Sequence, residues 1–523
     1  FLSSANVFDT FEHFPSYEYD KTLSESIYGR FKIKIENELL RLPPTKYVLA
    51  RLPMIFGNHS PRIQELDQAM KTNEPIEVFP NTIINFNNAL GFKESEFLKA
   101  TQGSIKLGIQ FENWGQDGDS YMHAFGNIGK DFAFCTFHNF WLRSQQEGIE
   151  SDFWDFSLNY QTAKQNKFAK LQQLPGTDLA GLSYAYHFDA GLYAKYLRGF
   201  CEAQGVKRVE GIINRVHQCS ESGFIKSVEL ESGVVVEGDL FLDCSGFRGL
   251  LIEQALETGY EEWGHWLPCD RAMAVPTVST DEVRPYTRSI AHKAGWQWNI
   301  PLQHRTGNGH VYCSDYMSDD EARQVLIDHL EGEPLAEPRN IPFKTGRRKK
   351  QWNKNCISFG LASGFLEPLE STSIHLIQAG LRRLVQHFPH NGIKEAEVDE
   401  FNRQSQIEFE HIRDFIILHY KVNQRTDSQF WIDCRNMDIP DSLAHRIDLF
   451  KSSGKVFKEG DELFHEIAWQ QVMIGQRLVP EDYHPLAHSI TRDQLEGLFR
   501  DLRSLIGSAV EKLPNHDAFL KAK

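Results

Sequence analysis

The segment from Phe359 to Pro389 constrains the fold of this chain more than any other stretch. It begins with small residues, passes through the turn at 367–370, and continues with apolar residues at helical spacing. Good N-cap residue types precede the apolar pattern, and Pro389 follows it as a stop signal. We therefore predict a helix whose core-facing positions are Ile374, Ile377, Leu381, Leu384 and Phe388.

The start of this helix also has the features of a small-anion site. The first N–H groups of a helix have no partner within it, and the helix dipole is positive at that end. A carboxylate, Glu370, stands directly beside the turn. A capped core helix with an acidic first turn explains the same residues, so the segment alone leaves both interpretations open.

Composition narrows the class of protein. The chain has 523 residues, of which 41% are hydrophobic and 24% charged, as in ordinary soluble globular proteins of more than one typical domain. Its net charge of -15 argues against binding the phosphate backbone of nucleic acids. We find no apolar run long enough for a membrane span and no signal-peptide pattern. We therefore expect no nucleic-acid partner and no membrane partner.

The cysteines indicate the compartment. Eight are scattered along the chain without a CxxC pair, which is typical of free thiols in a reducing cytoplasm. No group of histidines and cysteines has zinc spacing, so the sequence predicts no metal site. We expect a cytoplasmic protein.

Two expected strands carry further candidate residues. Residues 104–111 alternate, with apolar side chains on one face and Lys106 on the other, where a lysine is usually solvated. Residues 295–301 place Trp296 and Trp298 on one face of a strand. The two tryptophans are either the wall of a cavity or core filler.

A third candidate region combines a strand, a turn and a helix. The predicted buried strand 240–242 runs into the glycine-bearing turn 243–249, and a helix begins near Leu250. Such turns place backbone N–H groups where the phosphate or ribityl of a cofactor can approach, although many βα turns have this pattern without a ligand. Other expected elements are a helix capped by Asp189 and a mostly helical tail over 395–523.

Four segments taken together resemble the flavin-dependent halogenases, the group that includes the tryptophan halogenases. The segments are Lys106 in its strand, Asp243–Gly249 (DCSGFRG), Trp296–Pro301 (WQWNIP) and Glu367–Ser373 (EPLESTS). The WxWxIP segment is the signature of that family and is absent from related flavin hydroxylases. The resemblance runs from about Thr82 to Lys523 and implies an α/β, flavin-monooxygenase-like FAD-binding fold with a mixed sheet and a helical C-terminal lobe.

The resemblance also implies a reaction. Reduced FAD, supplied by a separate NADH-dependent flavin reductase, would react with oxygen and with chloride or bromide to give hypohalous acid. This molecule would travel through an internal tunnel to an electron-rich aromatic substrate such as indole. Lys106 would hydrogen-bond or capture the halogen, and Glu370 would position it and remove the ring proton. A homodimer is left open.

Further site residues are carried over from the family position by position. Thr372 and Ser373 match the halide-binding turn, with serine at 373 where tryptophan halogenases usually have glycine. The residues matched to cofactor binding are Asp243, Gly246, Arg248, Gly249, Gly360, Leu361 and Ser371. Those matched to substrate binding are His123, Phe125 and Trp469, and those matched to the tunnel wall are Trp296, Trp298 and Pro301.

Two departures from the family pattern shape the expectations. Residues 469–475 lack the paired tyrosines expected to bind the amino-acid end of tryptophan, so we predict a substrate without that group. Residues 1–81 form an atypical N-terminal segment without the usual glycine-rich FAD loop.

We assign 82–394 to the catalytic region and 395–523 to a helical C-terminal substrate lobe. The alternatives are a flavin-dependent aromatic hydroxylase, which would act without halide, and an inactive relative that does not hold FAD.

Overall fold

The computed structural model describes residues 2–4, 50–52, 82–132, 134–279 and 282–522. Nearly all of the predicted N-terminal segment, 1–81, lies outside these residues. The chain divides into two units, one of residues 1–96 with 378–401, the other of residues 97–377 with 402–523. Every site residue predicted from the sequence belongs to the second, larger unit.

The predicted boundary between residues 394 and 395 falls inside the smaller unit. Residues 402–523, predicted as a separate lobe, share the larger unit with most of the predicted catalytic region. The functions assigned to these regions stay predictions.

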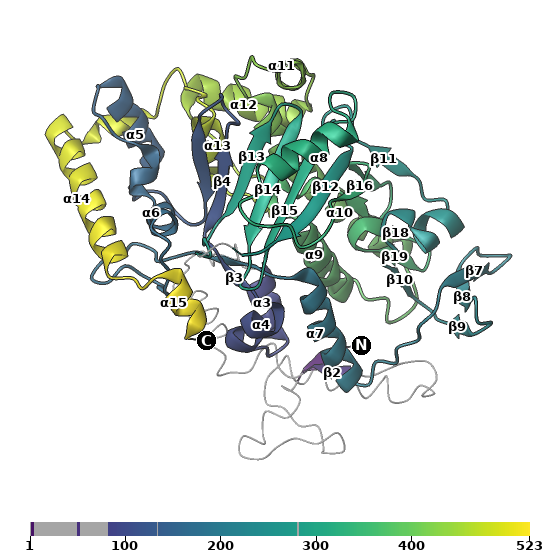
Figure 1. Cartoon of the computed structure of the whole chain (residues 1–523). Helices are drawn as coiled ribbons and strands as arrows, with labels where there is room; N and C mark the ends of the chain where they lie inside the picture. The colour runs from purple at the N-terminus through teal and green to yellow at the C-terminus, as the bar shows by residue number, and fades with distance from the viewer. Residues whose placement is uncertain (1, 5–49, 53–81, 133, 280–281, 523) are drawn as a thin grey trace. The chain divides into compact units, whose positions relative to one another are not determined.

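The larger unit is built on a seven-stranded mixed sheet (Figure 1). Its strands, in spatial order, are β16 (Arg339–Pro342), β12 (Arg271–Thr277), β15 (Thr306–Tyr312), β14 (Gly295–Pro301), β13 (Thr287–His292), β4 (Gly108–Glu112) and β5 (Ser120–Ala124). All neighbouring strands are antiparallel except β13 and β4, which run parallel. The mixed α/β fold that we predicted is confirmed.

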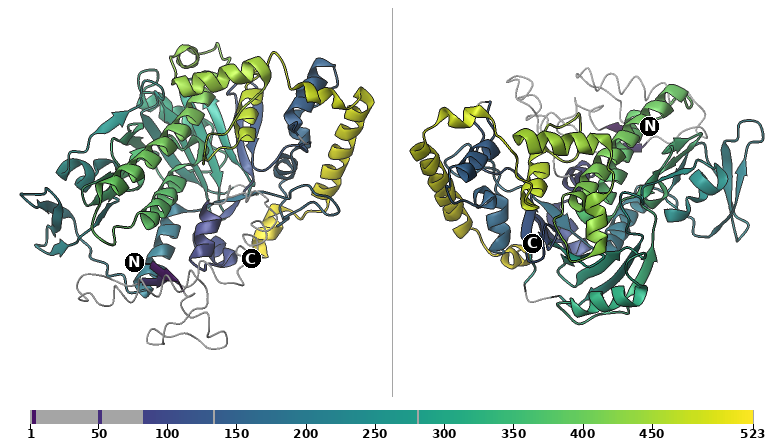
Figure 2. Two further views of the ribbon diagram at one scale, coloured as in Figure 1. Left: turned by 180° about the vertical axis from the view of Figure 1, so that it is seen from behind. Right: turned by 90° about the horizontal axis from the view of Figure 1, so that it is seen from above.

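Helices cover both faces of this sheet. Helix α8 (Asp319–Asp328) packs on β12 and β15, and helix α13 (Glu466–Gly475) packs on β5. In the view from behind in Figure 2, the part of the long helix α10 (Glu395–Lys421) that belongs to the larger unit, residues 402–421, lies on the opposite face from α8. Its residue His419 stacks on Phe111 of β4, with ring centroids 4.6 Å apart.

The expected strand over 104–111 is two strands that meet at Leu107. β3 (Ser104–Lys106) pairs with β6 (Ala185–His187), whereas β4 pairs with β5 and β13. All side chains of β3 and β4 are buried except that of Glu112, which is half-buried. The expectation that Lys106 faces solvent is therefore wrong, because neighbouring elements cover both faces of these strands.

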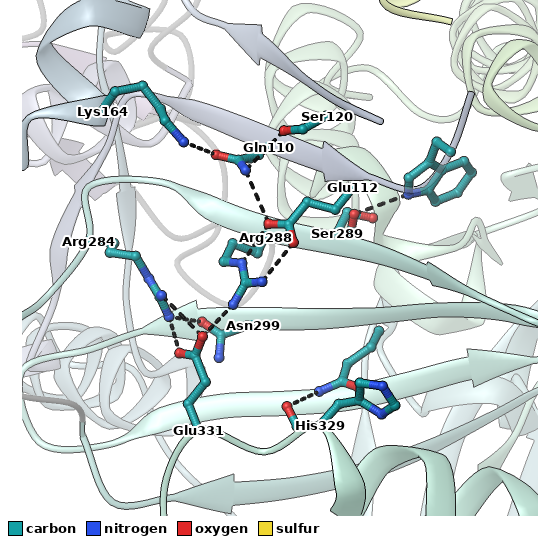
Figure 3. A network of polar contacts seen from close by, with 12 residues as sticks. Gln110, Glu112, Ser120, Lys164, Arg284, Arg288, Ser289, Asn299, His329 and Glu331 are labelled. Atoms are coloured by element: carbon teal, nitrogen blue, oxygen red, sulfur yellow. Dashed lines mark hydrogen bonds and ion pairs between the residues drawn. The ribbon is translucent and has the colours of Figure 1, made fainter. Parts of the chain in front are cut away.

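The polar face of β4 is covered by a network of charged and amide side chains (Figure 3). Glu112 accepts two hydrogen bonds from Arg288, at 2.6 and 2.7 Å. Glu331 pairs with both Arg288 and Arg284, and Lys164 donates to Gln110 at 2.8 Å. Paired in this way, the polar side chains of β4 are satisfied without a fully solvated face.

The remaining strands form small sheets. One consists of β7 (Ile213–Gln218), β8 (Ile225–Leu230) and β9 (Val235–Glu237); another of β10 (Phe241–Asp243), β19 (Cys356–Ser358) and β18 (Trp352–Asn353); a third of β11 (Tyr260–Glu262), β17 (Gly346–Arg348) and β20 (Gly364–Phe365); and a pair of β1 (Leu2–Ser4) and β2 (Ala50–Leu52). The predicted strand 240–242 corresponds to β10. Its burial was predicted wrongly, because β10 is an edge strand and Leu242 is 45% exposed.

The other helical elements are α3 (Thr82–Ala89), α4 (Glu94–Thr101), α5 (Phe137–Gln146), η3 (Phe153–Phe156), α6 (Leu158–Lys164), α7 (Ala190–Ala203), η4 (Gly246–Arg248), η5 (Leu250–Ala255), η6 (Gly360–Ala362), η7 (Pro368–Glu370), α9 (Ser373–Gln386), α11 (Gln429–Asn436), α12 (Asp441–Ser453), η8 (Pro485–Ser489), α14 (Arg492–Glu511) and α15 (His516–Lys521). Asp189 caps α7 by accepting from two backbone N–H groups, as predicted. The helical character predicted for the C-terminal tail is also confirmed.

Helix α9 begins after Thr372 and ends before Pro389, as the sequence predicts. The predicted core face is covered only in part: Leu384 is buried, Ile374, Ile377 and Leu381 are half-buried, and Phe388 is 41% exposed. The buried positions include Ala379 and Gly380. Helical spacing identifies such a helix, but the neighbours decide which face is covered, and small side chains permit the closest approach.

All eight cysteines are free thiols. Within the described ranges, no helix has the length and apolar character that a membrane crossing requires.

Candidate active site

Lys106 ends β3 inside the larger unit and is only 4% exposed. Its Nζ donates to Ser371 Oγ at 3.0 Å and lies 5.8 Å from the centroid of the Phe125 ring. Burial lowers the pKa of Lys106 to about 8, although the nearby Glu370 carboxylate favours the charged amine. The fold thus brings the lysine to the turn that carries Glu370, across a sequence separation of 265 residues between the bonded partners.

Glu370 is the last residue of η7, and its side chain is 1% exposed. His123 Nδ1 lies 2.9 and 3.1 Å from its two carboxylate oxygens, as a hydrogen-bond donor. Burial by itself would raise the pKa of Glu370, but His123 and His419 outweigh it and lower the pKa to about 2. The side chain is therefore a carboxylate at neutral pH.

His419 of α10 is a site residue that the sequence analysis missed. Its Nε2 lies 3.1 Å from Glu370 Oε1, within ion-pair distance but without a regular hydrogen bond. Gln476 donates to the Tyr121 hydroxyl at 3.1 Å, so this hydroxyl is free to donate to His419 Nδ1, also at 3.1 Å. A neutral His419 then carries its proton on Nε2, the ring nitrogen nearest the carboxylate.

An aromatic cluster surrounds His123. Its ring centroid lies 6.0 Å from that of Phe125, 5.7 Å from Phe415 and 6.1 Å from Phe464. Phe415 in turn contacts Trp469, at 4.8 Å between centroids. The three residues predicted to bind substrate therefore lie in one aromatic cluster beside Glu370, and their role stays a prediction.

Helix α13 is fastened to the strand that carries His123. The side-chain amide of Gln471 accepts from Ala124 N at 2.9 Å and donates to Ala124 O at 3.0 Å. Both groups are buried, so each hydrogen bond replaces water that the backbone would otherwise need. These two hydrogen bonds fix the position of Trp469, two residues before Gln471, relative to the end of β5.

The turn predicted to bind halide directly follows Glu370 in the chain. Ser371 adopts a left-handed backbone with φ 59°, and its hydroxyl, predicted to contact the cofactor, accepts from Lys106. Thr372 is 1% exposed, and its Oγ1 has no hydrogen-bond partner in the part of the chain that the structure describes. Ser373 is the first residue of α9. A buried hydroxyl with an unused proton at a helix N-terminus fits a small anion.

The two segments predicted to hold the cofactor lie side by side. η4 contacts η6, and β10 runs parallel to β19, so residues 243–249 and 360–362 meet. Gly246 adopts φ 73° with open space around it, and Arg248 is exposed. Leu361 is 38% exposed. These observations fit a bound flavin.

Asp243 has a local role that the sequence analysis did not foresee. Its buried carboxylate accepts from the backbone N–H groups of Ser245, Leu251 and Ile252 at 2.8–2.9 Å. Two of the N–H groups offered by the helix start are thus bound by the protein itself. Cofactor binding by Asp243 stays a prediction.

Replacing Asp243 by alanine is expected to destabilise the larger unit by about 3 kcal/mol, because three backbone N–H groups lose their acceptor. Urea unfolding of the purified protein measures this change. Asp239→Ala, an exposed aspartate four residues earlier, is the matched control and should change stability by less than about 0.5 kcal/mol. Equal effects of the two substitutions would contradict the capping role.

The predicted wall residues lie on β14. The rings of Trp296 and Trp298 are 6.2 Å apart, and Trp296 is 1% exposed. Trp296 Nε1 donates to Glu367 Oε2 at 3.0 Å. The Trp298 ring lies over Gly309, where a Cβ atom would stand 2.0 Å from it. Pro301 ends the strand, buried and paired with Thr306.

One group among the described residues could offer metal ligands, namely His411, Glu459 and Glu462. Glu462 is already engaged by Arg446, whose guanidinium donates to both carboxylate oxygens at 2.7 and 3.0 Å. We assign no metal to it.

Comparison with known proteins identifies relatives of this arrangement. Residues 77–492 match the model of the tryptophan halogenase family. The tryptophan 7-halogenase RebH of Lentzea aerocolonigenes is 31% identical over 477 residues, covering 84% of this chain and 89% of the relative. Among solved structures, a flavin-dependent halogenase from Xanthomonas campestris is 46% identical with a TM-score of 0.82, covering 84% of this chain and 88% of that one. The halogenase BrvH from Brevundimonas sp. BAL3 is 43% identical with a TM-score of 0.83, covering 84% and 90%.

Proposed function

Since the chain belongs to the tryptophan halogenase family, whose members are flavin-dependent halogenases of aromatic compounds, we propose that Lys106 and Glu370 are its catalytic pair. The observation that carries the proposal is their burial in one site, bridged by the contact of Lys106 with Ser371 and flanked by the aromatic cluster around His123. An ammonium group and a carboxylate that are both shielded from water act more strongly on a reacting molecule than in solution.

The cofactor and the halide have separate places in this proposal. The flavin would be held by Asp243, Gly246, Arg248, Gly249, Gly360, Leu361 and Ser371, and the halide by Thr372 and Ser373. When bound, reduced FAD supplies, with oxygen, the oxidising power that converts halide into hypohalous acid.

We also propose that electrons reach the enzyme through a separate NADH-dependent flavin reductase and that the enzyme is cytoplasmic. Sedimentation of the purified chain tests whether it forms a homodimer.

Lys106 activates the halogen. In its protonated form the amine donates a hydrogen bond to the oxygen of hypohalous acid, which makes the halogen more electrophilic. The halogen forms a bond to a ring carbon while its bond to oxygen breaks, and the oxygen leaves as water with the lysine proton. A compact ammonium group on a flexible stem suits this transfer better than the planar guanidinium of arginine.

Glu370 then completes the substitution. The ring carbon that gained the halogen still carries its hydrogen, and the carboxylate accepts this proton as the ring recovers its aromaticity. His123 and His419 hold the carboxylate ionised and fixed in orientation. The protons balance over the cycle, because Lys106 loses one and Glu370 gains one before both return to their starting states.

We propose that the substrate is indole or another electron-rich aromatic without an amino-acid end. Two polar side chains near Trp469 are already paired within the protein. Arg446 lies 4.1 Å over its ring and is bound to Glu462, and Gln471 is bound to the backbone of Ala124. A tryptophan zwitterion in this region would need partners of its own, and burying it without them is costly.

The test supplies the purified enzyme with FAD, NADH, a flavin reductase and either bromide or chloride, and compares indole with tryptophan by product mass. We expect halogenated indole, with kcat/KM at least about 100-fold above that for tryptophan. Equal turnover of tryptophan would contradict the proposed substrate class, and a hydroxylated product formed without halide would reject the halogenation mechanism.

A further inference from the structure

Glu367 is a buried carboxyl group that the mechanism above does not use. It is 0% exposed. Its Oε2 accepts from Trp296 Nε1 at 3.0 Å and from the Tyr420 hydroxyl at 2.5 Å. Its Oε1 is also buried and has no hydrogen-bond partner among the described residues. Burying a carboxyl group with one oxygen left without a partner costs free energy, which points to a role of this group in the site.

The surroundings of Glu367 favour its neutral form. Its two hydrogen-bond donors, an indole and a phenol, carry no positive charge that could offset the burial of a carboxylate. The Tyr420 hydroxyl also lies 3.7 Å from Cys269 Sγ, and burial raises the pKa of this thiol well above its ordinary value. Burial likewise raises the pKa of Glu367 to about 7, against the effect of its two donors.

Glu367 and Glu370 engage the same stretch of helix α10. Glu367 directly precedes η7 and Glu370 ends it, three positions later. The two side chains contact consecutive residues of α10, with Glu367 bonded to Tyr420 and Glu370 beside His419. Glu367 also reaches β14 through Trp296. One carboxyl group therefore joins three elements, namely the turn before α9, the long helix and the strand of the sheet.

We propose that Glu367 is a positioning residue of the halogenation site, which clamps Trp296 of β14 and Tyr420 of α10 to the turn that carries Glu370 and Ser371. The inference rests on the proposed catalytic roles of Lys106 and Glu370. Through this clamp Glu367 sets the place of the Glu370 carboxylate and of the hydroxyl that receives the Lys106 hydrogen bond. It does not touch the substrate in this role.

Two substitutions distinguish the hydrogen bonds that Glu367 accepts from the space that its side chain fills. Glu367→Leu keeps most of the volume but leaves the Trp296 and Tyr420 donors without an acceptor, and we expect kcat for halogenation to fall at least about 10-fold. Glu367→Gln retains an amide oxygen as acceptor, and we expect kcat within about 3-fold of the unmodified enzyme. KM for the aromatic substrate should change by less than about 2-fold in both, because the aromatic cluster is untouched.

A second measurement does not depend on activity. Glu367 has an ordinary pKa of 4.5 and a folded-state pKa of about 7, so the folded protein binds the proton more tightly than the unfolded chain. The contribution of Glu367 to the stability of the unmodified protein should therefore fall as pH rises from about 4.5 to about 7, and this loss persists at higher pH. Glutamine at position 367 cannot titrate. The melting temperature of Glu367→Gln should therefore rise relative to that of the unmodified protein between about pH 4.5 and about pH 7.

Glu112→Gln is the matched control for the stability measurement. Its carboxylate lies on the polar face of β4 and is bound to Arg288, so the same chemical change removes a charged acceptor and should lower stability at neutral pH. If the melting temperatures of Glu367→Gln and the unmodified protein change in parallel with pH, Glu367 does not act as a protonated clamp in the folded protein, and the proposal is overturned.

The outcomes for the clamp and for the catalytic pair are distinguishable. If Lys106 and Glu370 variants keep the full halogenation rate, the proposed function fails whatever Glu367 does. If those variants lose the rate and folded Glu367→Leu retains it, the positioning role alone is overturned. Should Glu367→Leu not fold, Tyr420→Phe removes one donor to the clamp, and an unchanged kcat in that variant would overturn the role.

Discussion

Lys106→Met is expected to lower the halogenation rate by at least about 1,000-fold while the protein stays folded. Methionine fills nearly the same space but offers no donor to the hypohalous acid and none to Ser371. Product mass spectrometry with indole and bromide measures the rate. Lys106→Arg should not restore it, because the larger planar guanidinium does not fit a buried site shaped for one amine.

The stability of the Lys106→Met variant provides the control. The pKa of the lysine falls from 10.5 to about 8 on folding, so the cost of burying its charge is fully present below about pH 8 and fades as pH rises to about 10.5. Removing the amine should therefore stabilise the protein at neutral pH by up to about 3 kcal/mol. A variant that is both more stable and inactive cannot owe its inactivity to unfolding. Retained activity would remove Lys106 from the mechanism.

The same lysine predicts the alkaline side of the pH–rate profile. Because Lys106 acts as a protonated hydrogen-bond donor in the proposed mechanism, the rate should fall as pH rises through about 8. If the neutral amine captures the halogen instead, the rate should rise over the same range. Single-turnover rates at saturating substrate distinguish the two forms, because the direction of the change is opposite.

Glu370→Gln is expected to lower the rate by about 100- to 10,000-fold, because an amide cannot accept the ring proton. Glutamine retains the shape of the side chain and one oxygen that faces His123, so substrate KM should change little. Rapid-quench measurement of product formation tests the rate, with Glu112→Gln as the matched carboxyl-to-amide control away from the site. A near-normal rate in Glu370→Gln would exclude it as the proton acceptor.

The stability of the Glu370→Gln variant has a defined pH dependence. The pKa of Glu370 is 4.5 ordinarily and about 2 in the folded protein, so its ionised contact with His123 stabilises the fold above about pH 4.5. This contribution is lost as pH falls towards about 2. The unmodified protein should therefore be more stable than the variant at neutral pH, and the difference should shrink over this acidic range.

The sequence predicted the parts of the site that have local signals. The resemblance to the family pointed to Lys106, Glu370 and His123, whereas the strand pattern alone favoured a solvated lysine. The structure brings these three residues to one site. His419 was missed because nothing near it in α10 distinguishes it from any polar residue of a long helix. Its importance follows from tertiary contacts with Tyr121 and Glu370, which helical periodicity does not report.

The incorrect predictions share a physical origin. Alternation in 104–111 correctly indicated strands, but a polar face covered by a charged network has the same pattern as one in water. The apolar spacing of α9 correctly indicated a helix, but its buried face follows Ala379 and Gly380. In each case the local pattern determined the secondary structure, and the neighbours in space determined what was buried.

The two hydrogen bonds between Gln471 and Ala124 have a consequence for altering the enzyme. Helix α13 carries Trp469 in the aromatic cluster and also holds the backbone next to His123, the partner of Glu370. A variant library at position 471 would therefore change chemistry and selectivity at once, and would yield mostly slow catalysts. Phe464 is a ring of the cluster that lies outside this helix, so under the proposed substrate site randomising Phe464 is the better route to enzymes that accept bulkier arenes.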